Sequence, residues 1–147
     1  MSRRKARIIA FQALYSWDVN KAPIEDLLNF SWLDKAGDEE EEKSETVEAD
    51  VDEDKTFASF IITGTIDHID EIDEVIKAHL SSSWTFDRIN KVSLAILRTS
   101  IYELKFQPEA VPGIVIDEAV NMAKNYGTDD SYKFINAVLD KIGKNEA

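Results

Sequence analysis

Four basic residues at the start of the chain are the clearest candidates for a binding function. Arg3, Arg4, Lys5 and Arg7 open an apolar pattern with helical spacing, where the positive end of the helix dipole disfavours each cation by about 0.3–1 kcal/mol. Helix stability alone therefore does not explain them. Cations at this density bind phosphate, and the following stripe of Ile8, Phe11 and Tyr15 lies off the expected core face. Rings beside cations suit single-stranded RNA. A frayed, solubilising terminus is the alternative.

Other residues with metal-binding or catalytic chemistry form no convincing arrangement. His68 and His79 stand eleven positions apart, without the spacing of a zinc site. Asp50, Asp52 and Asp54 imitate the start of a calcium loop but lack the glycine and the glutamate that complete one. The chain has no cysteine, and its five glycines are too scattered for a phosphate loop. We expect no metal, no cofactor and no catalytic constellation.

The net charge of −12 is concentrated in one segment. Residues 38–54 contain eleven acids and one lysine, a local charge of −10, which leaves −2 for the rest of the chain. This composition cannot bury enough apolar surface to offset the entropy of ordering. We therefore predict that residues 35–54 form a disordered acidic loop inserted in a single domain that spans residues 1–147.

The remaining apolar pattern is helical throughout, which predicts an all-α, compact bundle of six to seven helices. The segment Asn90–Phe106 is apolar almost all round, as expected for a central helix, and Gly127 is a candidate C-terminal cap. No run reaches the roughly 18 apolar residues of a membrane span, and the N-terminus does not resemble a signal peptide. We expect a soluble, cytoplasmic protein with no membrane contact. The expected helices are Ser2–Asn20, Ile24–Leu33, one or two from Phe57 to Leu80, Asn90–Phe106, one after Pro112 and one from Thr128.

Three blocks in this order resemble the NusB family of bacterial transcription antitermination factors. The first is RRKARIIAFQALYSWD at the N-terminus, the second is DRINKVSLAILRTSIYEL from Asp87, and the third is IDEAVNMAKNYGTDDSYKFINAVLDKI from Ile116. The resemblance covers essentially the whole chain except the acidic segment. It implies two packed helical subdomains and no enzymatic activity.

The resemblance also implies partners and the residues that contact them. A family member pairs with a small-subunit ribosomal protein, NusE, binds single-stranded boxA RNA, and joins the RNA polymerase antitermination complex, which suppresses premature termination and supports ribosomal RNA synthesis. The implied RNA-binding residues are Arg3, Arg4, Lys5, Arg7, Tyr15, Lys133 and Phe134. The implied protein-partner residues are Tyr15, Asp87, Ser93 and Arg98.

Several of these residues have a structural alternative. Arg98 lies in an apolar helix, where an unpaired charge is costly, so it is equally well explained by an ion pair with Glu103 or Asp87. Phe134 and Tyr15 can belong to the core, and Lys133 can be an ordinary solvated lysine.

The function has alternatives as well. A helical adaptor that binds proteins without touching RNA is one, and a homodimer that masks the RNA site is another. The methyltransferases that carry a similar domain are a third, but no glycine-rich cofactor loop follows here.

Overall fold

The structure is a computed structural model that describes residues 3–30, 45–80, 85–128 and 130–146. Within these ranges the chain is all-helical, with seven α-helices, one short 3₁₀ helix and no strand, as the sequence predicts. The helices are α1 (Arg4–Val19), α2 (Ile24–Asn29), α4 (Glu45–Asp67), α5 (Ile69–Ala78), the 3₁₀ helix η1 (Phe86–Arg88), α6 (Lys91–Phe106), α7 (Pro112–Tyr126) and α8 (Ser131–Glu146).

Helix α6 is the centre of the bundle, which confirms the prediction for Asn90–Phe106. It packs against α1, α4, α5, α7 and α8, and these neighbours bury it on nearly all sides. Asn90 caps its N-terminus, where the side-chain oxygen accepts a hydrogen bond of 2.9 Å from the backbone N–H of Ser93. The fully buried large side chains of α6 are Leu94, Ile96, Leu97 and Ile101.

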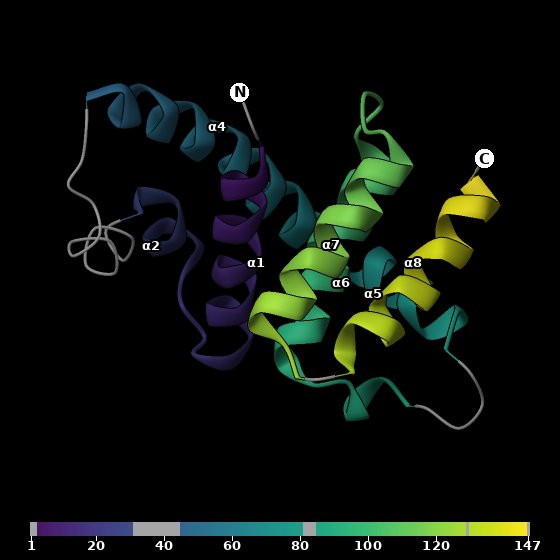
Figure 1. The fold of residues 1–147 in the computed structure, drawn as a ribbon. Coiled ribbons are helices and arrows are strands. Elements are labelled where there is room, and N and C mark those ends of the chain that lie inside the picture. Colours follow the sequence, from purple (N-terminus) through teal and green to yellow (C-terminus); the bar gives the residue numbers. More distant parts are fainter. Residues whose placement is uncertain (1–2, 31–44, 81–84, 129, 147) are drawn as a thin grey trace.

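Two groups of helices meet on α6. Helices α1, α2 and α4 contact one another, α7 packs along α8, and both groups contact α6. Figure 1 shows α1, α2 and α4 on one side and α7 and α8 on the other, with α6 behind them. This arrangement agrees with two packed helical subdomains.

Local backbone conformation sets where the first helices end. Phe30 follows α2 with a φ of 59°, a left-handed conformation that stops the helix. The predicted end of this helix at Leu33 lies outside the described residues. The pattern from Phe57 to Leu80 resolves into two helices, α4 and α5, because the backbone leaves the helical region at His68, with a φ of −111°.

The acidic segment is partly helical, which corrects the prediction of a disordered loop over residues 35–54. Helix α4 begins at Glu45 rather than near Phe57, while residues 35–44 lie outside the described residues. The physical reason is that glutamate is a good helix former. Like-charge density alone is therefore a poor guide to the start of this helix.

Gly64 allows α4 and α6 to approach closely. The ring of Tyr102 lies directly over the Gly64 backbone, where an added Cβ would overlap the ring atoms Cζ and Cε1. Tyr102 also stacks near Phe106 and His68, with ring centroids 5.6 and 6.3 Å away. Glycine is required here because of space, since its φ is not positive.

Gly127 ends α7, as predicted, but it does not adopt the left-handed conformation that is usual for a glycine at the C-terminal cap. Its φ of −97° and ψ of −172° are extended, and its N–H donates a hydrogen bond of 2.8 Å to the carbonyl of Ala123. An added Cβ would overlap the hydroxyl of Ser131. Helix α8 begins at Ser131 rather than Thr128. The Ser131 hydroxyl donates a hydrogen bond of 2.9 Å to the carbonyl of Thr128, which holds the turn before the helix.

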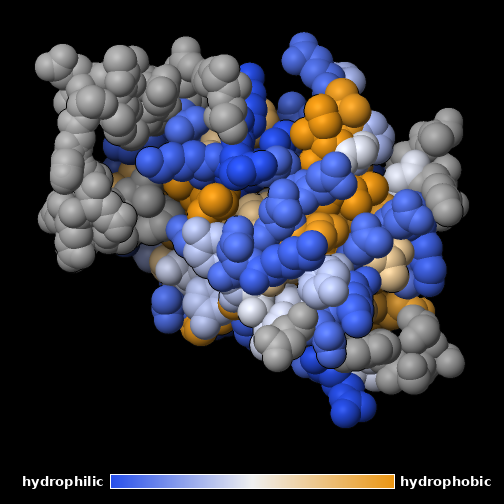
Figure 2. All heavy atoms as spheres, viewed as in Figure 1, coloured by the Kyte–Doolittle hydropathy of each residue, from blue (hydrophilic) through white to orange (hydrophobic). Residues whose placement is uncertain are grey.

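The surface over α1, α7 and α8 is mostly hydrophilic. Figure 2 shows this face in blue, with an apolar patch over the N-terminal end of α7, where Val111 and Ile114 are exposed. No described helix is long and apolar enough to cross a membrane.

We expect Gly64→Ala to lower the free energy of unfolding by about 1–3 kcal/mol, because the new methyl group forces Tyr102 and the α4–α6 contact apart. Urea unfolding measures this change. Gly113→Ala is the matched control, since a Cβ at Gly113 meets nothing within 4 Å, and it should leave stability unchanged or slightly higher. Equal effects of the two substitutions would contradict the steric explanation.

Candidate nucleic-acid interface

The basic start of α1 is exposed and unfavourable for the helix itself. Arg3 occupies the N-cap position without a side-chain capping hydrogen bond, and the first turn contains no acidic residue. The Arg3 guanidinium instead lies over the ring of Phe57 on α4, with Cζ 3.9 Å from the ring centroid. This cation–π contact fixes the first cation beside α4 and leaves it exposed to a ligand.

Arg7 has a different environment from its neighbours. Its Nε and Nη2 donate hydrogen bonds of 2.8 and 2.9 Å to the two carboxylate oxygens of Glu103 on α6. The side chains are only 13% and 4% exposed. A bidentate pair with this burial holds α1 on α6, so the guanidinium of Arg7 is already used inside the fold.

Arg4 is paired at the surface. Its Nε and Nη2 donate to the carboxylate of Glu118 on α7 at 3.0 and 3.2 Å. The hydrogen bond and charge of Glu118 raise the pKa of Arg4 above its usual value. The Arg4 side chain is 60% exposed, whereas that of Glu118 is 15% exposed. The exposed part of the Arg4 guanidinium is therefore accessible to another anion while Arg4 stays paired with Glu118.

Lys5 is exposed, and among the described residues it has no ion-pair partner. Together with Arg3 and Arg4 it forms the basic end of α1, a name used below for these three residues. The basic end lies at the surface, while Arg7 lies one turn further on and faces α6.

The stripe of Ile8, Phe11 and Tyr15 is more buried than the sequence indicates. Phe11 is 3% exposed and makes an edge contact with Tyr126 on α7, with ring centroids 5.4 Å apart. Ile8 and Tyr15 are half-buried and pack against the core. The expectation that this stripe lies off the core face is therefore wrong for Phe11, because α7 covers it.

The two other implied RNA-binding residues lie on α8. Lys133 is exposed, with Nζ 3.8 Å from Asp130 Oδ1 and 6.0 Å from the ring centroid of Tyr132. Phe134 is half-buried and packs against the core. Lys133 presents its charge to solvent, whereas only part of Phe134 is accessible.

The implied protein-partner residues are not all at the surface. Asp87 is exposed on η1, but Ser93 is buried at 1% exposure. Arg98 is also buried, and its Nε and Nη2 donate hydrogen bonds of 2.9 Å to the carboxylate of Asp73 on α5. Its Nη1 lies 3.6 Å from Asp18 on α1.

Arg98 thus takes the structural role foreseen as an alternative, but with other partners. Glu103 is not one of them because it binds Arg7, and Asp87 lies exposed on η1. The helices α5 and α1 instead bring Asp73 and Asp18 to the guanidinium. Direct contact of Ser93 or Arg98 with a partner remains a prediction that their burial disfavours.

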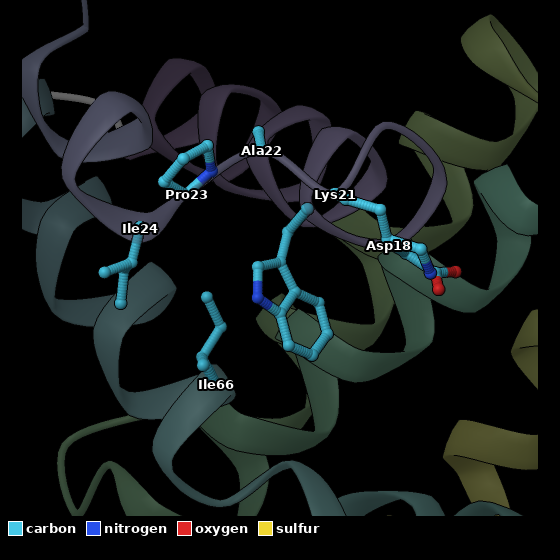
Figure 3. Close-up of a pocket in the computed structure, with 7 residues that line it drawn as sticks. Asp18, Lys21, Ala22, Pro23, Ile24 and Ile66 are labelled. Carbon is cyan, nitrogen blue, oxygen red and sulfur yellow. The ribbon is translucent and has the colours of Figure 1, made fainter.

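A pocket of about 500 Å³ lies at the opposite end of α1 from the basic residues. Figure 3 shows Ile24 and Ile66 on one side of it and Asp18 and Lys21 on the other. Its walls are mainly apolar, and its seven lining residues include one carboxylate and one ammonium group. The full lining is Trp17, Asp18, Lys21, Ala22, Pro23, Ile24 and Ile66.

The two histidines stand at the two ends of α5. His68 is its N-cap residue and His79 its C-cap residue; Nδ1 of His68 lies 2.7 Å from Glu71, and Nδ1 of His79 lies 2.9 Å from the carbonyl of Val75. Within the described part of the chain, no three histidine, aspartate or glutamate side chains are grouped to hold a metal ion. Both histidines have local structural contacts instead.

The sequence matches the model of the NusB family over residues 4–144. The chain belongs to the NusB family. It is 48% identical to a transcription antitermination protein NusB of Treponema denticola, over 97% of this chain and 96% of the relative. Its fold is similar to NusB of T. maritima, with a TM-score of 0.76 and 32% identity over 98% of this chain and 92% of that one.

A second structural match is to a NusB solved as a complex. The chain resembles the crystal structure of the antitermination factors NusB and NusE in complex with dsRNA, with a TM-score of 0.77 and 29% identity. The match covers 99% of both chains. The helical order described above is thus the NusB fold across its full length.

Sequence reasoning missed two aromatic features of this NusB-family chain. Phe57 lies under Arg3, although its spacing marks it only as a core residue of α4. Tyr126 is a large, exposed side chain at the end of α7 that the third block contains but that no spacing rule singles out. The position of Tyr126 two residues after Lys124 was the one available signal, because rings near cations are typical of single-stranded RNA sites.

We expect Arg7→Ala to destabilise the protein by about 3 kcal/mol or more, because it leaves the buried Glu103 carboxylate without its partner. Lys5→Ala should change the free energy of unfolding by less than about 0.5 kcal/mol, because Lys5 is exposed. Chemical denaturation of both variants measures the difference. The Arg7→Met, Glu103→Leu double variant is the control, and its recovery of stability would show that the loss comes from an unpaired charge.

Proposed function

We propose that the chain is an RNA-binding transcription antitermination factor that pairs with the ribosomal protein NusE. The pair binds boxA-type RNA, joins the RNA polymerase antitermination complex and supports ribosomal RNA transcription. The observation that carries this proposal is the near full-length match to a NusB solved with NusE and dsRNA, together with a basic end of α1 that helix stability does not explain. Its action is binding rather than catalysis, in the cytoplasm.

The basic end of α1 is the phosphate-binding part of the proposed interface. Arg3 and Lys5 are exposed, and the Arg4 side chain stays 60% exposed beside Glu118, so a phosphate can approach it as well. Arg7 is not among the proposed phosphate-binding residues, because moving it to a phosphate would leave the buried Glu103 carboxylate without a partner. Three cations rather than four are thus available for RNA.

Tyr15, Lys133 and Phe134 extend the proposed RNA surface along α1 and α8. Lys133 contributes charge, and the accessible parts of Tyr15 and Phe134 contribute ring surface. For the protein partner, Tyr15 and Asp87 are the proposed contact residues. Ser93 and Arg98 contribute by shaping the α6 surface, because both are buried in this chain.

The number of cations can be counted from salt dependence. For single-stranded RNA each neutralised phosphate contributes about 0.7 to the slope of log K against log salt, so the three residues of the basic end should contribute about −2 and Lys133 about −0.7 more. Titration of boxA-type RNA with NusE present, at several salt concentrations, measures this slope.

Lys5→Ala should reduce that slope by about 0.7 and weaken binding. Lys77→Ala is the matched control, because Lys77 is also exposed but lies on α5 beside Glu74, and it should change neither quantity. Solution mass measured in the same samples distinguishes the complex with NusE from a homodimer. An affinity independent of salt, or none for RNA while NusE still binds, would favour the protein-binding adaptor instead.

A further inference from the structure

Tyr126 is an exposed aromatic side chain held in a fixed position at the end of α7. It is 46% exposed, although tyrosine is a large and partly apolar residue. The buried ring of Phe11 supports it with an interplanar angle of 62°. A ring that is fixed on one side and open to solvent loses little conformational freedom when it binds a ligand.

A second ring, Tyr132, lies just after the turn that follows Tyr126, and one cation lies on each side of this turn. Nζ of Lys124 lies 4.9 Å and Nζ of Lys133 lies 6.0 Å from the ring centroid of Tyr132. The turn is tight, because Gly127 lies against Ser131 where no Cβ would fit. The end of α7 and the start of α8 therefore present rings and ammonium groups together.

Helix α7 connects this group to the basic end of α1, because α7 contacts α1 along its length and ends at Tyr126. Arg4 contacts Glu118 and Phe11 contacts Tyr126, so α1 and α7 run side by side in the same direction. The eight residues from Glu118 to Tyr126 span about 12 Å of helix. Figure 1 shows α1, α7 and α8 all in front of α6, so one RNA strand can contact both ends.

The carboxylate in this group does not prevent the binding of an anion. Asp130 lies 3.8 Å from Lys133, and the two side chains are 84% and 68% exposed. Such a pair is weak, so Lys133 can turn to a phosphate. Rings flanked by exposed lysines fit a nucleic acid, because its bases can stack on the rings while its phosphates bind the ammonium groups.

We propose that Tyr126 stacks on an unpaired base of bound RNA, and that Lys124 and Lys133 beside Tyr132 bind the flanking phosphates. This inference rests on the proposed function and names a contact for the same RNA. It assigns a role to three residues outside the basic end of α1: Lys124, Tyr126 and Tyr132. It also explains why a tyrosine at the surface is supported by a buried phenylalanine.

The test is the affinity of Tyr126→Ala and Tyr126→Phe for boxA-type single-stranded RNA with NusE present. Stacking on an aromatic ring is worth about 1–3 kcal/mol per base, which is about a 5- to 150-fold loss of affinity for Tyr126→Ala. Tyr126→Phe should bind like the wild type. The salt slope should stay unchanged in both, because no charge is removed.

Two measurements separate stacking from a general structural effect. Fluorescence of 2-aminopurine placed in the RNA should be quenched by the wild type and by Tyr126→Phe, and not by Tyr126→Ala. Ile114→Ala is the matched control, because Ile114 is a similarly exposed apolar residue at the other end of α7, and it should bind RNA normally. Circular dichroism checks that Tyr126→Ala remains folded.

The outcomes also separate this inference from the proposed function. If wild-type protein with NusE binds no boxA-type RNA, the proposed function fails. If the wild type binds and Tyr126→Ala binds equally well, only the inference is overturned. A loss of NusE affinity without RNA, with RNA affinity unchanged, would assign Tyr126 to the protein interface and also overturn it.

Discussion

The ion pair between Arg7 and Glu103 constrains the position of α1, on which the rest of the surface depends. Helix α1 approaches α6 and α4 closely, because its inner face carries the small, fully buried residues Ala6, Ala10 and Ala13. A charge placed in so tight a contact needs a partner, and Glu103 supplies it in bidentate geometry. The pair fixes the rotation of α1 about its axis, and that rotation directs Lys5 and Arg3 to the surface.

Helix α1 serves three purposes along its length because its surroundings change from turn to turn. Its first turn is basic and exposed, its middle is packed against α6 and α7, and its last residues line the pocket with Asp18. The same residue type therefore has opposite roles one turn apart. Arg4 pairs with Glu118 while its own side chain stays 60% exposed, whereas Arg7 and Glu103 are both buried in their pair.

A net charge of −12 is compatible with RNA binding because charge acts locally. Exposed charges interact over a Debye length of about 10 Å at moderate salt, and residues 38–54 carry −10 of the net charge of −12. The arginines near the basic end are balanced by Glu103 and Glu118. This balance reduces the number of free cations, and it makes the salt dependence of binding smaller than a count of basic residues suggests.

The sequence by itself determined the helical class, the central position of Asn90–Phe106 and the family, because apolar periodicity and three ordered blocks are properties of the chain alone. It also located the basic end of α1. Only the tertiary structure decided which arginines are held in buried ion pairs, because Glu103 and Asp73 lie 96 and 25 positions from their partners Arg7 and Arg98. The covering of Phe11 by Tyr126 likewise depends on how α7 packs on α1. Periodicity gives the face of a helix that is buried, but partners distant in sequence are chosen by packing.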